Sequence, residues 1–160
     1  MFLSTYESKI DAKNRVSVPA SFRKALGGDD VICVWPSFGK SKDCLEGGSK
    51  KLVNGLYKSI RKMKPMDPRR QALEYGILGE CKELQFDGAG GRIVLPQKFV
   101  DAAGITGEVA FVGLGERFEI WSKERLEAKR AEFMELAAES GDLIEALDFD
   151  FDFDEDEDAA

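Results

Sequence analysis

Short apolar runs with two different periodicities follow one another along this chain, and they predict a mixed fold of strands and helices. Val16-Ser17-Val18 alternates with period two, which is typical of a half-buried strand. Pro19 then begins a short helix, on which Phe22 and Leu26 lie four residues apart, and Gly27-Gly28 ends it. Further strands are expected over residues 2–6 and 31–35, with a shorter segment over 44–46.

The second half of the chain repeats this order of elements. Strands are expected over residues 84–86, 93–95, 109–112 and 118–121, and a short helix is expected over residues 96–103, before Gly104. An offset of 77 residues relates four pairs of identical residues: Arg15 and Arg92, Pro19 and Pro96, Phe22 and Phe99, and Gly27 and Gly104. Four matches at one offset indicate an internal duplication.

Two helices are expected between the copies. Ser49 is predicted to cap the first, which runs to about Met63. Its buried stripe consists of apolar residues at helical spacing: Leu52, Leu56, Ile60 and Met63. Asp67-Pro68 combines an N-cap residue with proline at the first helical position, and it predicts a second helix to about Ile77.

These patterns place the protein in the α+β class, as two β-barrel-like halves with short helices. The first repeat is expected over residues 1–64, a helical connector over 65–81 and the second repeat over 82–141. Within the second repeat, Ser122 is predicted to cap a final helix whose residues Leu126, Phe133 and Leu136 face inward. An acidic tail, expected to be disordered, follows over residues 142–160.

Charge is distributed unevenly along the chain. The formal net charge is −7, yet residues 148–160 contain eight acidic residues and no basic ones. Residues 1–80 contain fifteen basic and nine acidic residues, whereas residues 81–147 contain eight basic and thirteen acidic ones. A basic first half suits a phosphate-rich partner. The lysines of the helix over 49–63 fit either a nucleic-acid surface or an ordinary solvated face.

The acidic tail is a low-complexity segment in which phenylalanine alternates with aspartate from Asp148 to Asp154. Its self-repulsion predicts disorder. It also has two functional interpretations, namely a docking segment for a protein partner and a polyanion that competes with DNA for the basic half.

Composition argues against several classes of function. No apolar run is long enough to span a membrane, and no cationic segment followed by an apolar run marks a secretory signal. The chain has three cysteines without a Cys-x-x-Cys pair and no histidine, so we expect reduced cytoplasmic thiols, no metal and no cofactor. Without histidine, and without a nucleophile beside Asp11 or Asp87, an enzyme is not expected.

The candidate chemistry lies in the turn from Asp11 to Arg15. Three residues separate the carboxylate from the guanidinium, so a tight turn lets the two side chains meet. An arginine held in this way can bind guanine or a phosphate. Lys9 and Lys13 are expected to contact phosphates, and Asn14 to adopt the left-handed conformation. The alternative is a structural turn, whose exposed ion pair contributes only about 0–1 kcal/mol.

The second turn, from Asp87 to Arg92, differs from the first. Four residues separate its acid and arginine, no lysine follows until Lys98, and Val100 replaces the second arginine of the first copy, Arg23. Its glycines lack the Gly-Lys-Ser/Thr sequence of a phosphate-binding P-loop, so they indicate a turn with positive backbone angles. Asp87 and Arg92 are therefore secondary candidates.

Taken together, the two turns and their surroundings resemble the MraZ family of bacterial transcriptional regulators, which share the swapped-hairpin fold of AbrB-like proteins. The matching residues are Asp11, Lys13, Arg15, Pro19, Phe22, Arg23, Asp87, Gly91, Arg92, Leu95, Pro96, Gly104, Val112-Gly113, Phe118-Glu119 and Trp121. The family turn is Asp-x-x-Gly-Arg, so Asn14 replaces its glycine here and the second copy has one extra residue. Gly47-Gly48 also stands where the second copy has Ile120-Trp121.

The resemblance implies a cytoplasmic, nucleoid-associated protein that binds repeated DNA elements in the promoter of its own division and cell-wall gene cluster. It also implies a ring-shaped homo-oligomer, in which each subunit contributes the same turn. A protein-interaction module remains the alternative, in which the fold binds a partner as AbrB-like antitoxins bind toxins, or does so through the acidic tail.

Overall fold

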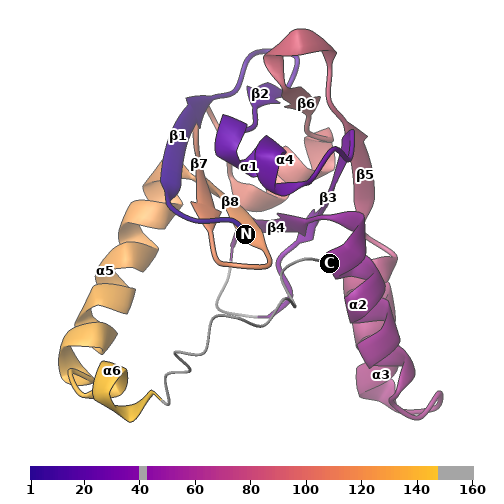
Figure 1. Ribbon diagram of the computed structural model, residues 1–160, viewed down its shortest axis with the longest axis vertical. Helices are drawn as coiled ribbons and strands as arrows, with labels where there is room; N and C mark the ends of the chain where they lie inside the picture. The colour runs from indigo at the N-terminus through magenta and orange to yellow at the C-terminus, as the bar shows by residue number, and fades with distance from the viewer. Residues whose placement is uncertain (40–42, 148–160) are drawn as a thin grey trace. The chain divides into compact units, whose positions relative to one another are not determined.

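Strands from both halves of the sequence share one sheet in the computed structural model, which describes residues 1–39 and 43–147 (Figure 1). The six-stranded sheet is antiparallel throughout, in the order β1 (Thr5–Lys9), β7 (Glu108–Gly113), β8 (Phe118–Ser122), β4 (Leu45–Gly48), β3 (Val31–Pro36) and β5 (Lys82–Gln85). A separate two-stranded sheet joins β2 (Arg15–Ser17) to β6 (Arg92–Val94).

Short helices connect these strands, so the fold belongs to the predicted α+β class. They are α1 (Ala20–Ala25), α2 (Lys50–Arg61), α3 (Pro68–Leu73), the π-helical η1 (Glu74–Leu78), the 3₁₀ turn η2 (Gly88–Gly90), α4 (Gln97–Ala103), α5 (Lys123–Glu139) and α6 (Leu143–Ala146). Helix α6 falls within the predicted tail. Residues 148–160, for which disorder was expected, lie outside the described residues.

The pairing exchanges strands between the two halves. Strand β1 of the first half pairs with β7 of the second, and β5 of the second half pairs with β3 of the first. The offset of 77 residues carries β2 onto β6 and β3 onto β7. Corresponding strands therefore have corresponding partners, which places β4 and β8 side by side in the middle of the sheet.

The main core fills the space between the six-stranded sheet, the β2–β6 pair, α1 and α4. Val16 and Ile93 point into it from β2 and β6, and Phe22 of α1 packs edge-on against Phe2 at a centroid distance of 5.2 Å. Phe118 lies 5.5 Å from Phe22. Burying each such side chain contributes about 1.5–3 kcal/mol, so this aromatic cluster fixes the sheet beneath β2 and β6.

On the opposite face of the sheet, a charged group lies between two tryptophans. Glu46 of β4 faces Glu119 of β8, and Arg117 Nη1 donates to both carboxylates at 3.2 and 2.9 Å. Trp35 Nε1 donates to Glu46 at 3.1 Å, and Trp121 Nε1 donates to Glu119 at 3.0 Å. Hydrogen bonds thus compensate the burial of two carboxylates at the junction of the two halves.

Close packing explains why glycine occupies positions 47 and 48. A Cβ atom on Gly47 would lie 2.6 Å from the Phe118 ring and 2.9 Å from the carbonyl oxygen of Cys33, and one on Gly48 would overlap the Leu52 side chain. The aromatic ring of β8 and a leucine of α2 therefore occupy the space that larger residues would need.

All three predicted helix caps are confirmed. Ser49 Oγ accepts a hydrogen bond from the backbone N–H of Leu52, Asp67 Oδ1 accepts from Arg69, and Ser122 Oγ accepts from Arg125. The first strand, however, begins at Thr5 rather than at Phe2. Ser4 has a φ of 74°, which interrupts the extended chain, and Phe2 instead forms an isolated bridge with Gly115.

The prediction for the inner face of the last helix is wrong beyond its first turns. Leu126 is buried, but Phe133 and Leu136 are 55% and 58% exposed. The chain divides into one unit over Met1–Leu126 and a second that begins at Glu127. The spacing of apolar residues along a helix does not reveal whether another element packs against the face that they form. No helix in the described part of the chain combines the length and apolarity of a membrane span.

Candidate nucleic-acid interface

Asp11 to Arg15 forms a hairpin turn that leads into β2. The backbone N–H of Asp11 donates to the carbonyl of Arg15 at 3.1 Å, and the carbonyl of Asp11 accepts from the N–H of Asn14 at 3.0 Å. Asn14 has a φ of 61°, as the sequence predicted for this position. Three-residue hairpin loops need one left-handed residue, and asparagine tolerates that conformation better than most.

The Asp11 carboxylate organises this turn. Its Oδ1 atom accepts from the backbone N–H groups of Lys13 and Arg15, both at 2.9 Å, and Oδ2 accepts from Arg15 Nε at 2.7 Å. The backbone hydrogen bond from Arg15, followed by that residue's side-chain bond, holds the pKa of Asp11 below its usual value. The predicted contact between Asp11 and Arg15 is therefore present, and it uses only one edge of the guanidinium.

Each turn is bonded to the other half of the sequence. The carbonyl of Asn14 accepts from the N–H of Leu95 at 2.9 Å, and the carbonyl of Gly91 accepts from the N–H of Val18 at 3.0 Å. Gly91 has a φ of 62°, nearly that of Asn14. The two hydrogen bonds correspond to each other under the 77-residue offset. Each of them holds one turn in place at an end of the β2–β6 pair.

The register of β2 and β6 brings both predicted arginines to one surface. Arg15 lies opposite Val94, and Ser17 lies opposite Arg92, while Val16 and Ile93 between them are buried. Since side chains alternate along a strand, Arg15 and Arg92 share the outward face. Diagonal neighbours of this kind lie about 7–8 Å apart. We call this outward surface of β2 and β6, together with the turn residues 11–14, the paired-turn face.

The two lysines of the prediction differ in their relation to this face. Lys13 is exposed within the first turn, next to Arg15. Lys9 is exposed at the end of β1, where it lies opposite Glu108 of β7. Lys13 therefore belongs to the paired-turn face, whereas Lys9 lies on the strand that leads to it.

The extra residue of the second turn is accommodated before Gly91. Residues 88–90 form the 3₁₀ turn η2, and the N–H of Asp87 donates to the carbonyl of Arg92 at 2.7 Å. Among the described residues, the Asp87 carboxylate forms no ion pair with Arg92. The second turn thus positions the backbone at Arg92, but it lacks the carboxylate contact that holds Arg15.

Two supporting residues were absent from the predicted site. Arg23 of α1 donates from Nε to the carbonyl of Val18 at 3.2 Å, and its side chain packs directly against Gly91. Gln97 of α4 accepts from Asn14 Nδ2 at 3.0 Å. Each helix therefore supports the turn of the opposite copy. Periodicity does not reveal this crossing, although Arg23 is one of the residues that match the family motif.

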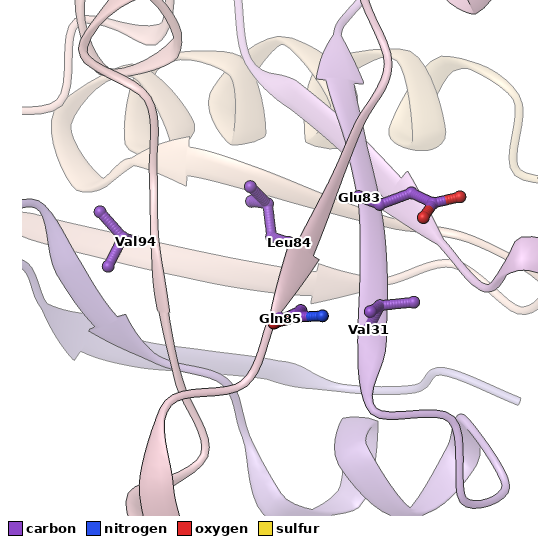
Figure 2. A pocket seen from close by; sticks show the side chains of 5 residues that line it. All are labelled: Val31, Glu83, Leu84, Gln85 and Val94. Atoms are coloured by element: carbon purple, nitrogen blue, oxygen red, sulfur yellow. The ribbon is translucent and has the colours of Figure 1, made fainter.

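A shallow hollow of about 360 Å³ opens beside β6. Val31, Glu83, Leu84, Gln85 and Val94 line it, and Figure 2 shows the Leu84 side chain directed from β5 toward β6 and the Val94 side chain directed away from β5. This lining contains one carboxylate, one amide and no cation, so the hollow does not extend the cationic part of the paired-turn face. In the described part of the chain, no cluster of His, Cys, Asp and Glu could hold a metal ion.

The fold and site define a class of α+β protein in which two hairpin turns present arginines from one two-stranded sheet. The chain belongs to the MraZ family, because the family model described as "MraZ protein, putative antitoxin-like" matches residues 1–52 and 77–145.

Curated relatives support the same assignment. A protein of Caulobacter vibrioides (strain NA1000 / CB15N) is 48% identical over 141 residues, covering 87% of this chain and 88% of the relative. One of Phenylobacterium zucineum (strain HLK1) is 46% identical, covering 86% and 84%. One of Pelagibacter ubique (strain HTCC1062) is 44% identical, covering 79% and 81%. All three are named "Transcriptional regulator MraZ".

Proposed function

We propose that this protein is a sequence-specific DNA-binding transcriptional regulator and that the paired-turn face contacts the duplex. The observation that carries the proposal is the Asp11–Arg15 contact, in which a carboxylate orients a guanidinium on an outward turn. A guanidinium in this position can fork onto guanine in the major groove or onto a phosphate. The names of the relatives support the regulatory role.

The residues have separate roles in this proposal. Arg15 reads or anchors the DNA, and Asp11 and Asn14 hold the turn in shape. Lys13 and Lys9 contact phosphates, which position the protein without reading sequence. Arg92 contributes a secondary contact from the second turn, with Asp87 bonded to it through the backbone.

The chain is further proposed to be an internally duplicated AbrB-like fold, and the exchange of strands between the halves supports this. The DNA elements are repeats in the promoter of the protein's own division and cell-wall gene cluster. A cytoplasmic, nucleoid-associated homo-oligomeric ring presents several identical faces to them. Weak single contacts to tandem repeats gain strength through effective concentration.

A band-shift experiment tests the proposal. The purified protein is titrated into labelled DNA from upstream of its own gene, with a shuffled duplex of equal length as control, over a series of salt concentrations. The logarithm of the affinity should fall linearly with the logarithm of the salt concentration. At each salt concentration, the affinity for the upstream DNA should exceed that for the shuffled duplex. Equal affinity for both duplexes would refute sequence-specific recognition.

The alternative function is that of an antitoxin-like protein-interaction module, which the family description "putative antitoxin-like" favours. In that case the same fold, or the acidic tail, would bind a protein partner. The band-shift distinguishes the two, because a pure interaction module should show no preference for its upstream DNA.

A further inference from the structure

Two of the three cysteines lie in one cluster on the outer face of the sheet. Cys33 of β3 is buried there beside Trp35 and Ile77, and Cys81 packs against the same cluster from the chain between η1 and β5. In the β3–β5 register Cys33 lies opposite Glu83, which places Cys81 diagonally across from it. The third cysteine, Cys44, belongs to a different cluster with Trp121 and Leu126.

The two thiols differ in exposure. Cys33 is 2% exposed, whereas Cys81 is only partly buried. Cys81 also lies three residues after the end of the π-helical segment at Leu78, and such segments are frequent at functional sites. A small oxidant in solvent therefore reaches Cys81 before Cys33.

Local hydrogen bonds favour the thiolate at Cys81. A hydrogen bond with the Cys33 thiol lowers the pKa of Cys81, partial burial and Glu83 oppose this effect, and the backbone of Val34 adds to it. The same contact with Cys81, followed by burial, raises the pKa of Cys33. The cluster thus combines a partly buried thiol whose pKa is lowered with a buried one whose pKa is raised.

We propose that Cys33 and Cys81 form an oxidisable dithiol site whose reagent is a peroxide. The Cys81 thiolate attacks one oxygen of hydrogen peroxide, which breaks the O–O bond, releases hydroxide and leaves Cys81 as a sulfenic acid. The released hydroxide removes the Cys33 proton as water, and the Cys33 thiolate then attacks the Cys81 sulfur. An S–S bond forms, the S–O bond breaks, and the hydroxyl group leaves as hydroxide.

The disulfide closes a loop from residue 33 to residue 81, which contains β4, α2 and α3. Because it ties the chain after η1 to β3, it constrains the unfolded chain and raises the midpoint of thermal unfolding. The site lies on the sheet face opposite the core that supports β2 and β6. It is therefore independent of the proposed DNA function, and failure of either leaves the other intact.

Peptide mapping tests the proposal on the full chain. Reduced protein is treated with one equivalent of hydrogen peroxide, alkylated without reductant, digested and analysed by mass spectrometry. The expected product is a peptide pair linking Cys33 to Cys81, lighter than the sum of the two thiol peptides by two hydrogen atoms. Over-oxidation of Cys81 with Cys33 still alkylatable, or a Cys81–Cys81 link between two copies, would overturn the proposal.

Serine variants supply the matched comparison. Cys44→Ser should retain the peroxide-dependent loss of two thiols, whereas Cys81→Ser should leave Cys33 unoxidised. Because Cys33→Ser changes a buried position, competition labelling provides a check on the unmodified chain. With limiting iodoacetamide, Cys81 should be labelled several-fold more than Cys33 or Cys44. Equal labelling of all three would contradict the assigned order of attack.

Discussion

At the scale of single residues, Arg15 and Arg92 occupy corresponding positions but are held differently. Arg15 bonds through Nε to the Asp11 carboxylate, which also accepts two backbone N–H groups. Arg92 is held through its backbone, by the bridge to Asp87 and by its pairing with Ser17, and an arginine of the opposite copy packs on the neighbouring Gly91. The first turn therefore offers a directed guanidinium at a lower entropic cost on binding.

The Asp11 carboxylate predicts a specific pH dependence of stability. Since its folded-state pKa lies below the ordinary value of 3.8, the stabilisation is present above that pH and is lost as the pH falls through the folded pKa. The free energy of unfolding of Asp11→Asn should therefore be lower than that of the wild type at pH 7, and the two should converge in acid. Denaturant titrations from pH 7 to pH 2 measure this, with the exposed Asp29→Asn as control. A difference that persists unchanged in strong acid would contradict the account.

At the scale of elements, local chemistry predicted more than long-range pairing. The three caps and the left-handed Asn14 were predictable because each depends on residues within a few positions. The pairing of β1 with β7 was not, because period two specifies which side chains face inward but not which strand lies alongside. Of the site, the Asp11–Arg15 contact was predictable, and the support from Arg23 and Gln97 was not.

The second turn depends on Gly91. Its φ of 62° costs an L-residue about 1–2 kcal/mol, and a Cβ atom there would also overlap Arg23. Gly91→Ala should therefore lower the free energy of unfolding by at least about 1 kcal/mol. Gly107→Ala is the control, since a Cβ atom there meets nothing within 4 Å. Chemical denaturation of both variants provides the measurement, and equal stability would show that the turn tolerates a side chain.

At the scale of the whole molecule, the Glu46–Arg117–Glu119 group lies where the two halves of the sequence meet. Two buried carboxylates face each other across β4 and β8, with Arg117 bonded to both. The family resemblance could not predict this group as a unit, because it depends on β4 and β8 being neighbours. Arg117 joins the two carboxylates at the centre of the sheet.

Replacing that cation should be costly. Arg117→Met leaves the paired carboxylates without their shared arginine, and removing one partner of a buried ionic group typically costs about 3–5 kcal/mol. Since Arg117 is itself 37% exposed, solvent screening should bring the loss toward the lower end of that range. Thermal unfolding compared with Arg61→Met, an exposed arginine of α2, is the test. A loss no greater than that of the control would show that the group does not stabilise the sheet.

DNA binding also belongs to the scale of the whole molecule, because the outward face carries arginines from both halves. The direct test measures binding to the upstream DNA by fluorescence anisotropy for wild type, Arg15→Ala, Arg92→Ala and the control Lys51→Ala, an exposed lysine of α2. Circular dichroism and sedimentation verify that each variant folds and assembles as the wild type does.

Arg15→Ala should weaken binding by about 10-fold to 100-fold, corresponding to the about 1–3 kcal/mol of a lost bidentate contact. Arg92→Ala should weaken it less, and Lys51→Ala should leave specific binding nearly unchanged. If Arg15→Ala folds, assembles and binds its upstream DNA with wild-type affinity and salt dependence, the paired-turn face is not the DNA-binding site.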